Sequence, residues 1–520
     1  MKKLLYILLL FNTYKLVAQA PSKIWDKTIG GNDYDFATAS IATNDGGFVL
    51  VGPSSSGISG DKTEANRGGI NEFGFPFNDY WVVKINSLGH KVWDKTFGGN
   101  GEDFATSVVA TNDGGFVIAG YSNSGISGEK TQASKGLIDF WILKINGSGL
   151  KEWDKTIGGN NDDMAFSITN ATDGGFVIAG NSSSDISGDK TEDNPSSSVY
   201  GDYWVVKLSS TGIKVWDKQI SGPSFDSVKS ITTTTDGGFV VVGNSTSGIG
   251  YDKTEAGRGQ RDYWIVKLNS TGQIVWNKTI GGNKSDDPSA VVASNDGGFV
   301  IVGNSNSDII SEKTEACFGS DDYWIVKINS SGQKVWDNTF GGSGLERGGS
   351  LVSLVDGSFI IVGSSESNIS GNKSEASIGF EDFWLVKIDN LGQKIWDKTF
   401  GSTATDRANA ITKSSDGGFV TVGVSQGGIS ADKTEVNNGG YDYWILKISD
   451  SIVLFETITN GNWSVNSTWN TNTPPTATKT AKINSTHTVT IPNTGNEVKT
   501  IQMNGGIISL NGGTLEIKNQ

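Results

Sequence analysis

Short apolar stretches rich in β-branched and aromatic residues recur along the whole chain and predict β-strands. The stretch DYWVVKINSLGHKVWDKTFGG, at 79–99, contains two of them on either side of Ser87-Leu88-Gly89. Two strand signals joined by a short glycine-containing link predict a β-hairpin. Nearly the same stretch returns six more times, so the chain is built on a repeated hairpin.

Each copy contains four motifs at corresponding positions. W-D-K-T, or a close variant of it, begins at Trp25, Trp93, Trp153, Trp216, Trp276, Trp336 and Trp396. D-G-G-F, once D-G-S-F, begins at Asp45, Asp113, Asp173, Asp236, Asp296, Asp356 and Asp416. K-T or K-S has its hydroxyl residue at Thr63, Thr131, Thr191, Thr254, Thr314, Ser374 and Thr434. D-Y-W or D-F-W begins at Asp79, Asp139, Asp202, Asp262, Asp322, Asp382 and Asp442.

The distances between these motifs indicate the architecture. Trp25 and Asp45 are 20 positions apart, Asp45 and Thr63 are 18 apart, and the same values hold in every copy. Asp79 and Trp93 are 14 apart, again without exception where both motifs occur. A period of about sixty residues with four strand signals is typical of one β-propeller blade.

The second copy predicts the four strands of a blade. Strand A is expected at 103–110, strand B at 116–120, strand C at 139–145 and strand D at 152–156. The link Asn112-Asp113-Gly114 suits a tight A–B turn, because Asn, Asp and Gly tolerate positive φ.

The two ends of the repeat array predict how the ring closes. Trp25 precedes the first A strand, whereas the position 14 residues after Asp442 is Glu456 instead of Trp. We expect the N-terminal strand to complete the last blade, giving seven four-stranded blades without open sheet edges. The alternative, a linear β-solenoid, would leave the first W-D-K-T unpaired.

Strands C and D each supply one Trp per blade, and packing between neighbouring sheets explains them better than a series of sugar-stacking platforms. These structural residues are Trp25, Trp81, Trp93, Trp141, Trp153, Trp204, Trp216, Trp264, Trp276, Trp324, Trp336, Trp384, Trp396 and Trp444. A Lys three positions after each strand C Trp, such as Lys84, is expected to pair with a repeated Asp.

In a propeller the D–A and B–C loops share one face, called the loop face below. An acidic residue follows each W-D-K-T Trp by ten positions on that face: Asp35, Asp103, Asp163, Asp226, Asp286, Glu346 and Asp406. One interpretation is a ring around the channel mouth that binds a cation or a polar ligand. The other is that each carboxylate caps its own turn by accepting backbone N–H bonds.

All length variation falls in the B–C loop of the first and third blades. The first insert, within 69–78, carries Phe73, Phe75 and Phe77, and the third-blade insert carries Tyr200. Binding residues concentrate in such loops, and apolar residues placed there favour a partner. The alternative is that the first insert folds over the mouth and packs on its neighbour.

The N-terminus and the charge restrict location and partners. Residues 1–20 combine Lys2-Lys3, a short apolar run at 4–11 and Ala18-Gln19-Ala20, which predicts a secretory signal peptide cleaved near Ala20. The apolar run is too short for a membrane anchor, and no later segment predicts a membrane span. The net charge of -14, without a basic stripe, argues against nucleic acid. The lone Cys317 permits no intrachain disulfide.

Residues 451–520 differ from the repeats. Alternating Thr and Ile at 486–491, and Asn-Gly-Gly at 504–506 and 511–513, predict a small β-module that resembles the opening rungs of a β-solenoid.

The motifs G-G-N-x-x-D, D-G-G-F-V-x-x-G, D-Y-W-x-x-K and W-D-K-T resemble the bacterial secreted β-propeller repeat family over about residues 21–450. The N-G-N-W-S and S-T-W run of the tail is similar to a module of surface proteins exported by the type IX route. The resemblance implies an extracellular location and a structural or adhesive role more firmly than it implies chemistry.

Catalytic chemistry has little support in the sequence. The two His residues, His90 and His487, are far apart in sequence, so His-based metal sites and Ser-His-Asp triads are not indicated. Paired carboxylates could still hydrolyse glycosides. Calcium could bind the Asp-rich and Asn-rich loops, but the D-x-D-x-D-G spacing is missing, so no cofactor is predicted.

We therefore expect an all-β, secreted or cell-surface monomer: a seven-bladed β-propeller at 21–450 with a small C-terminal β-module at 451–520. Its expected function is non-catalytic binding or adhesion to an extracellular polysaccharide or surface protein through the loop face. The alternative is a propeller glycosidase or polysaccharide lyase that uses carboxylates of the same face.

Overall fold

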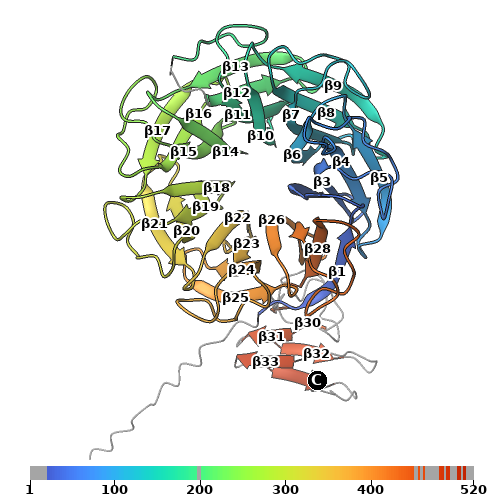
Figure 1. The fold of residues 1–520 in the computed structure, drawn as a ribbon. Helices are drawn as coiled ribbons and strands as arrows, with labels where there is room; N and C mark the ends of the chain where they lie inside the picture. The colour runs from blue at the N-terminus through green and yellow to red at the C-terminus, as the bar shows by residue number, and fades with distance from the viewer. Residues whose placement is uncertain are drawn as a thin grey trace, which may run out of the picture. The chain divides into compact units, whose positions relative to one another are not determined.

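The computed structural model describes residues 20–195 and 201–449, and beyond them the backbone of six short strands between 455 and 510. Residues Lys23–Ser449 form one compact unit. Within it, seven four-stranded antiparallel sheets surround a central axis, as Figure 1 shows. The described chain is therefore the expected seven-bladed β-propeller, while the predicted signal peptide lies outside the described residues.

Each blade contributes one strand to each of four concentric positions. The innermost strands are β2 (Ala39–Ala42), β6 (Asp103–Ala110), β10 (Asp163–Asn170), β14 (Asp226–Thr233), β18 (Asp286–Ala293), β22 (Glu346–Ser353) and β26 (Asp406–Lys413). The second strands are β3 (Phe48–Ser54), β7 (Phe116–Ser122), β11 (Phe176–Ser182), β15 (Phe239–Ser245), β19 (Phe299–Ser305), β23 (Phe359–Ser365) and β27 (Phe419–Ser425). The third strands are β4 (Asp79–Ile85), β8 (Asp139–Ile145), β12 (Asp202–Leu208), β16 (Asp262–Leu268), β20 (Asp322–Ile328), β24 (Asp382–Ile388) and β28 (Asp442–Ile448). The outer strands are β5 (Lys91–Phe97), β9 (Lys151–Ile157), β13 (Lys214–Ile220), β17 (Ile274–Ile280), β21 (Lys334–Phe340), β25 (Lys394–Phe400) and β1 (Lys23–Ile29).

The ring closes through the N-terminal strand, as the unpaired W-D-K-T predicts. Strand β1 pairs antiparallel with β28, with Thr28 opposite Trp444. The last blade therefore has the order β1-β28-β27-β26. Its two outermost strands, β1 and β28, come from opposite ends of the repeat array. This confirms the closed ring and excludes the linear solenoid for these residues.

A carboxylate on the outer strand connects three of the four motifs within a blade. Asp94 accepts hydrogen bonds from the indole Nε1 of Trp81 at 3.2 Å and from the backbone N and Oγ1 of Thr63, each at 2.8 Å. Burial alone would raise the pKa of Asp94, but these bonds and the ammonium of Lys91 outweigh it and lower the pKa. The equivalent indole–acceptor pairs are Trp141–Asp154, Trp204–Asp217, Trp264–Asn277, Trp324–Asp337, Trp384–Asp397 and Trp444–Asp26.

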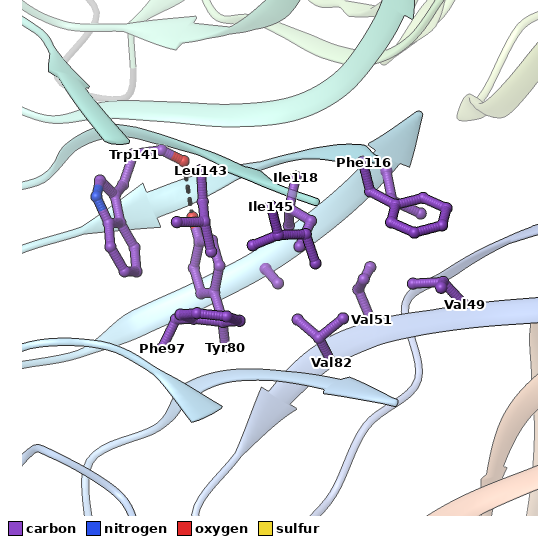
Figure 2. Packing of buried hydrophobic residues seen from close by; sticks show 12 residues of the cluster. Val49, Val51, Tyr80, Val82, Phe97, Phe116, Ile118, Trp141, Leu143 and Ile145 are labelled. Carbon is purple, nitrogen blue, oxygen red and sulfur yellow. Dashed lines mark hydrogen bonds between the residues drawn. The ribbon is translucent and has the colours of Figure 1, made fainter. Parts of the chain in front are cut away.

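The same Trp forms the contact between neighbouring blades. The ring of Tyr80 lies 4.7 Å from that of Trp141 in the next blade, and its hydroxyl donates to the Trp141 carbonyl oxygen at 2.9 Å (Figure 2). The contact also joins the last blade to the first, where the rings of Tyr443 and Trp81 are 5.0 Å apart. All seven strand C Trp side chains are fully buried, which confirms their structural role over a sugar-stacking one.

The outer-strand Trp residues also contact the following blade. Most of them are half-buried, and Trp25 packs on the C–D turn of the first blade at Gly89. Gly89 has φ near +81°, and a Cβ there would approach the Trp25 ring to 3.0 Å. Only glycine therefore meets both the turn geometry and the close approach.

The repeated Lys of strand C pairs with the A–B turn, as expected. Lys84 Nζ lies 2.7 Å from Asp45 of the D-G-G-F motif. Five further pairs repeat this ion pair: Lys144–Asp113, Lys207–Asp173, Lys267–Asp236, Lys327–Asp296 and Lys447–Asp416. The buried ends of these Lys side chains thereby fix the turn on the face opposite the loop face.

The strands after residue 449 belong to a separate unit. β29 (Phe455–Glu456), β31 (Thr480–Asn484) and β33 (Thr500–Asn504) pair in parallel, as do β30 (Gly461–Asn462), β32 (Thr488–Ile491) and β34 (Ile507–Leu510). Parallel pairing of successive short strands is the arrangement that solenoid rungs require. Across the described residues of both units, no helix is long and apolar enough to span a membrane.

We expect removal of residues 21–30 to lower the melting temperature by about 10 °C or more, because it exposes the edge of β28. Thermal unfolding followed by Trp fluorescence measures this. A synthetic peptide of residues 21–30 should restore stability when added, and a scrambled peptide should not. An unchanged melting temperature after the deletion would contradict closure by β1.

Asp94→Ala should destabilise the protein by roughly 2–4 kcal/mol, because a buried indole N–H, a backbone N–H and an ammonium lose their acceptor. Asp94→Asn should cost less, roughly 1–2 kcal/mol, because the amide oxygen keeps the indole bond, as Asn277 does in the fourth blade at 3.3 Å from Trp264 Nε1, but loses the ion pair with Lys91. Chemical denaturation compares the two variants. Equal losses for both would show that the acceptor oxygen is not what matters.

Candidate functional site

The seven acidic residues of the D–A loops are fully buried and cap their own turns. Asp103 Oδ2 accepts the backbone N–H of Gly99 at 2.7 Å and the hydroxyl of Ser124 at 2.8 Å. The other six carboxylates, of Asp35, Asp163, Asp226, Asp286, Glu346 and Asp406, accept the corresponding backbone N–H. With no exposed surface, they lie beneath the loop face instead of lining it. This is the capping arrangement, and the structure holds no exposed ring of these carboxylates.

Each of these carboxylates lies near the D-Y-W Asp of the preceding blade. A Cβ at Gly98 would fall 2.0 Å from Asp79 Oδ1 and 3.1 Å from Asp103 Oδ2, so the glycine leaves room for the pair. Burial raises the pKa of Asp79 to about 8, and the charge of Asp103 adds to that effect. Burial likewise raises the pKa of Asp139, Asp382 and Asp442 to about 6.

The first-blade insert forms a small hairpin on the loop face. Ile70 and Pro76 make an antiparallel bridge, and Asn71 accepts backbone bonds from Phe73 and Phe75 through its side chain. Phe73 and Phe75 are 76% and 63% exposed, so they do not pack on a neighbouring blade. Phe77 is half-buried at the base of the hairpin. The alternative of a packed lid is therefore wrong for the tip of the insert, and ligand binding there stays a prediction.

The third-blade insert is described only in part. Tyr200 lies outside the described residues, whereas the carbonyl of Pro195 accepts a bond from the Tyr251 hydroxyl of the next blade at 2.9 Å.

A cavity of about 470 Å³ lies on the axis, between the innermost strands. Its lining comes from five blades: Phe36, Thr38, Phe104, Thr106, Phe166, Lys229 and Asn409. These residues follow the buried acidic residue of their blade by one or three positions, on the side of the strand that faces the axis. Thr106 also donates to the carbonyl of Ala165 at 3.1 Å, which joins adjacent innermost strands beneath the mouth.

Aromatic side chains form one half of this channel mouth. The rings of Phe104 and Tyr121 stack at 5.2 Å with an interplanar angle of 3°, and Phe166 lies 6.4 Å from Tyr121. On the other side of the first blade, Phe36 and Tyr441 are 5.3 Å apart. Tyr34 lies 6.2 Å from Phe36 and 6.1 Å from Tyr441. The aromatic half thus runs from the seventh blade to the third.

The aromatic half adjoins the base of the Phe73 hairpin. Asn78, directly after the insert, donates to the carboxylate of Glu102 at 2.6 Å. Burial, together with the negative charge of Glu102, raises the pKa of Tyr121 to about 12. The Tyr121 hydroxyl therefore stays protonated and able to donate at any physiological pH.

Charged side chains form the other half. Buried Glu381 accepts from Arg347 Nη1 at 2.8 Å and from Arg407 Nε at 2.5 Å, and both Arg side chains remain nearly half exposed. Arg261 lies 3.4 Å from Asp287. Three of the five Arg residues in the chain therefore lie at this mouth, although the protein is strongly acidic.

Lys229 joins the two halves. Its Nζ lies 5.9 Å from the Phe166 ring centre, within cation–π range. The walls of the channel desolvate the ammonium and lower its pKa, while Asp287 partly opposes this shift. The ammonium is thus held between the aromatic and the charged half.

These residues were not predicted from the sequence. A detectable signal existed, because the position after each buried acidic residue changes type from copy to copy while its neighbours recur. That position holds Phe36, Phe104, Met164, Ser227, Asp287, Arg347 and Arg407. Among the described residues, no group of three or more His, Cys, Asp or Glu is arranged to hold a metal ion.

By architecture the protein belongs to the seven-bladed β-propellers. No protein-family model and no curated protein matches the sequence. Among solved structures, it is similar to a Bacteroides caccae protein of unknown function, with 15% identity over 62% of this chain and 90% of that chain and a TM-score of 0.35. It is also similar to a Dyadobacter fermentans protein of unknown function (10% identity; 82% and 99% covered; TM-score 0.42). A third is the Pan2 WD40 domain of Neurospora crassa (9% identity; 81% and 95% covered; TM-score 0.42).

We expect the free energy of unfolding to be highest near about pH 4.5 and to fall toward about pH 8. The buried Asp residues with raised pKa values, such as Asp79, stabilise the fold fully below the unfolded pKa of 3.8 and lose that contribution as pH rises through about 6 to 8. Below about pH 4 the free energy of unfolding falls as pH decreases. The reason is that Lys84 lowers the pKa of Asp45 to about 2 in the folded protein.

Urea unfolding at several pH values measures this dependence. Asp79→Asn should flatten the loss of stability between about pH 6 and 8, whereas Asp45→Asn should not. A stability that rises from about pH 5 to 8 would contradict the buried carboxylate pairs.

Proposed function

We propose that the protein is a non-catalytic extracellular binding module that recognises a polysaccharide or a surface protein at the channel mouth. The observation that carries the proposal is that the mouth departs from the sevenfold repeat. The scaffold residues recur in every blade, while the residues around the axis change from aromatic to charged. A site with different side chains on its two sides can bind a ligand in a single orientation. A sevenfold ring of identical groups cannot do this.

The aromatic half suits stacking against apolar faces such as sugar rings. Phe36, Phe104 and Phe166 are half-buried, so each ring keeps surface available to a ligand while its base is fixed. A cavity of about 470 Å³ is within the roughly 300–1,000 Å³ typical of small-ligand sites. The exposed Phe73 and Phe75 would extend the contact beyond the cavity.

The binding role is favoured over glycoside hydrolysis by the partners of the mouth carboxylates. Glu381 is paired with two Arg residues, Glu366 lies 3.6 Å from Arg347, and Asp287 contacts Arg261 and Asn244. A general acid needs a raised pKa and access to the glycosidic oxygen. Guanidinium and amide groups already bind the oxygens of these carboxylates, which restricts their access to a glycosidic oxygen.

One sequence feature supports the extracellular part of the proposal: the N-terminal segment has the pattern of a signal peptide. The mature protein would then start near Pro21, two residues before β1 begins at Lys23. Export would therefore leave the closing strand intact.

Phe104→Ala should weaken glycan or protein binding by roughly tenfold, because it removes half of a stacked aromatic pair at the mouth. Leu150→Ala is the matched control, since Leu150 is 60% exposed in a C–D turn on the opposite face. A glycan array identifies a ligand, and titration calorimetry compares the variants.

Turnover of the bound ligand is measured in parallel. If the ligand is turned over, and a single mouth substitution such as Asp287→Asn abolishes that turnover, the non-catalytic proposal is wrong. Equal loss of binding in Phe104→Ala and Leu150→Ala would argue against the channel mouth as the site.

A further inference from the structure

We propose that the ligand of the channel mouth is an acidic sugar, a pyranose ring that carries a carboxylate or a sulfate. This inference rests on the proposed binding function and specifies its ligand class. The ring would stack on the aromatic half, and its oxyanion would pair with Arg347, Arg407 and Lys229.

The Arg pair is organised before any ligand arrives. Glu381 is 3% exposed, and it accepts from Arg347 and Arg407 and from the Ser364 hydroxyl at 2.5 Å. The two guanidinium groups come from neighbouring blades, on β22 and β26, and a single carboxylate fixes both. A guanidinium has five N–H donors in a planar fork, so bonding to Glu381 leaves donors on each for an oxyanion.

The Arg pair adjoins the aromatic half of the mouth. Arg407 occupies the same repeat position as Phe36 and Phe104, which line the cavity, so its side chain lies on the axial side. Phe36 and Arg407 belong to neighbouring blades, and the Tyr441 ring of the Arg407 blade is 5.3 Å from Phe36. A ring stacked on Phe36 would therefore have its substituents within reach of Arg407.

The overall charge gives these cations a selective role. The chain carries a net charge of -14, so its field repels polyanions at most of the surface. Positive charge is concentrated around one cavity by four side chains, those of Lys229, Arg261, Arg347 and Arg407. Three carboxylates, those of Asp287, Glu366 and Glu381, lie beside them. An acidic sugar would gain charge-assisted bonds at the mouth alone, whereas a neutral sugar would gain only stacking.

The test compares four probes on the mature full-length protein: an oligogalacturonate tetrasaccharide, a κ-carrageenan tetrasaccharide, which carries sulfates and no carboxylate, a neutral cello-oligosaccharide of the same length and a polyglutamate peptide. Titration calorimetry at two salt concentrations measures affinity. We expect the carboxylated or the sulfated sugar to bind at least about tenfold more tightly than the neutral sugar and the peptide. Which acidic sugar binds identifies the source of the oxyanion.

Arg347→Gln should weaken binding of the acidic sugar by roughly 10- to 100-fold and leave Arg407 to pair with Glu381. Lys229→Met offers a second variant that leaves the Glu381 cluster intact, and it should weaken binding in the same direction. Arg258→Gln is the matched control, because Arg258 pairs with Glu312 in the outer loops. Thermal unfolding checks that each variant is folded.

Two results would overturn the inference: neutral and acidic sugars binding equally, or unchanged affinity in both Arg347→Gln and Lys229→Met. If the neutral sugar binds as tightly as the acidic sugars and Phe104→Ala removes that binding, the acidic-sugar inference fails while the proposed function stands. If no ligand found on the array loses affinity with Phe104→Ala, the proposed function fails as well.

Discussion

The hydrogen bond from a buried Trp indole to a carboxylate on the outer strand is the interaction on which the blade depends. An indole buried without an acceptor would cost the fold the desolvation of its N–H. The carboxylate supplies that acceptor and is itself kept ionised, because a Thr of the B–C loop and a Lys of the same outer strand also donate to it, as at Asp94. The third strand, the outer strand and the B–C loop therefore become ordered together. Since the same Trp contacts the aromatic ring of the preceding blade, order within a blade and order between blades are coupled.

Most of the scaffold could be predicted from sequence because its constraints repeat. Strands expected at 103–110 and 139–145 are observed with the same bounds, and the strands expected at 116–120 and 152–156 are each longer by two residues. Closure by Trp25 followed from counting motifs. What sequence could not establish was the direction of the acidic side chains. Asp103 has the same spacing whether it lines a channel or caps a turn, and only the burial of its carboxylate distinguishes the two.

The channel mouth was missed for a related reason. Variation in loop length identifies the hairpin with Phe73 and Phe75, whereas the blades differ at the channel mouth in residue type at a fixed position. Phe36 and Arg407 occupy the same position of the repeat, yet the blades that carry them are neighbours across the closure of the ring. Their proximity depends on β1 joining the seventh blade. Sequence can identify such positions as variable but does not show which of their side chains face the axis.

This arrangement separates stability from recognition. A substitution at a recurring position such as Asp94 removes an acceptor for several buried donors, so those positions are restricted in type. The residue after each buried acidic residue faces the axis, where Phe, Met, Ser, Asp and Arg are all accommodated in different blades. The backbone beneath them is held by bonds that do not involve these side chains, such as the contact of Thr106 with Ala165. The side chains of the mouth can therefore change without loss of the fold, and under the proposed function such changes alter which ligand is bound.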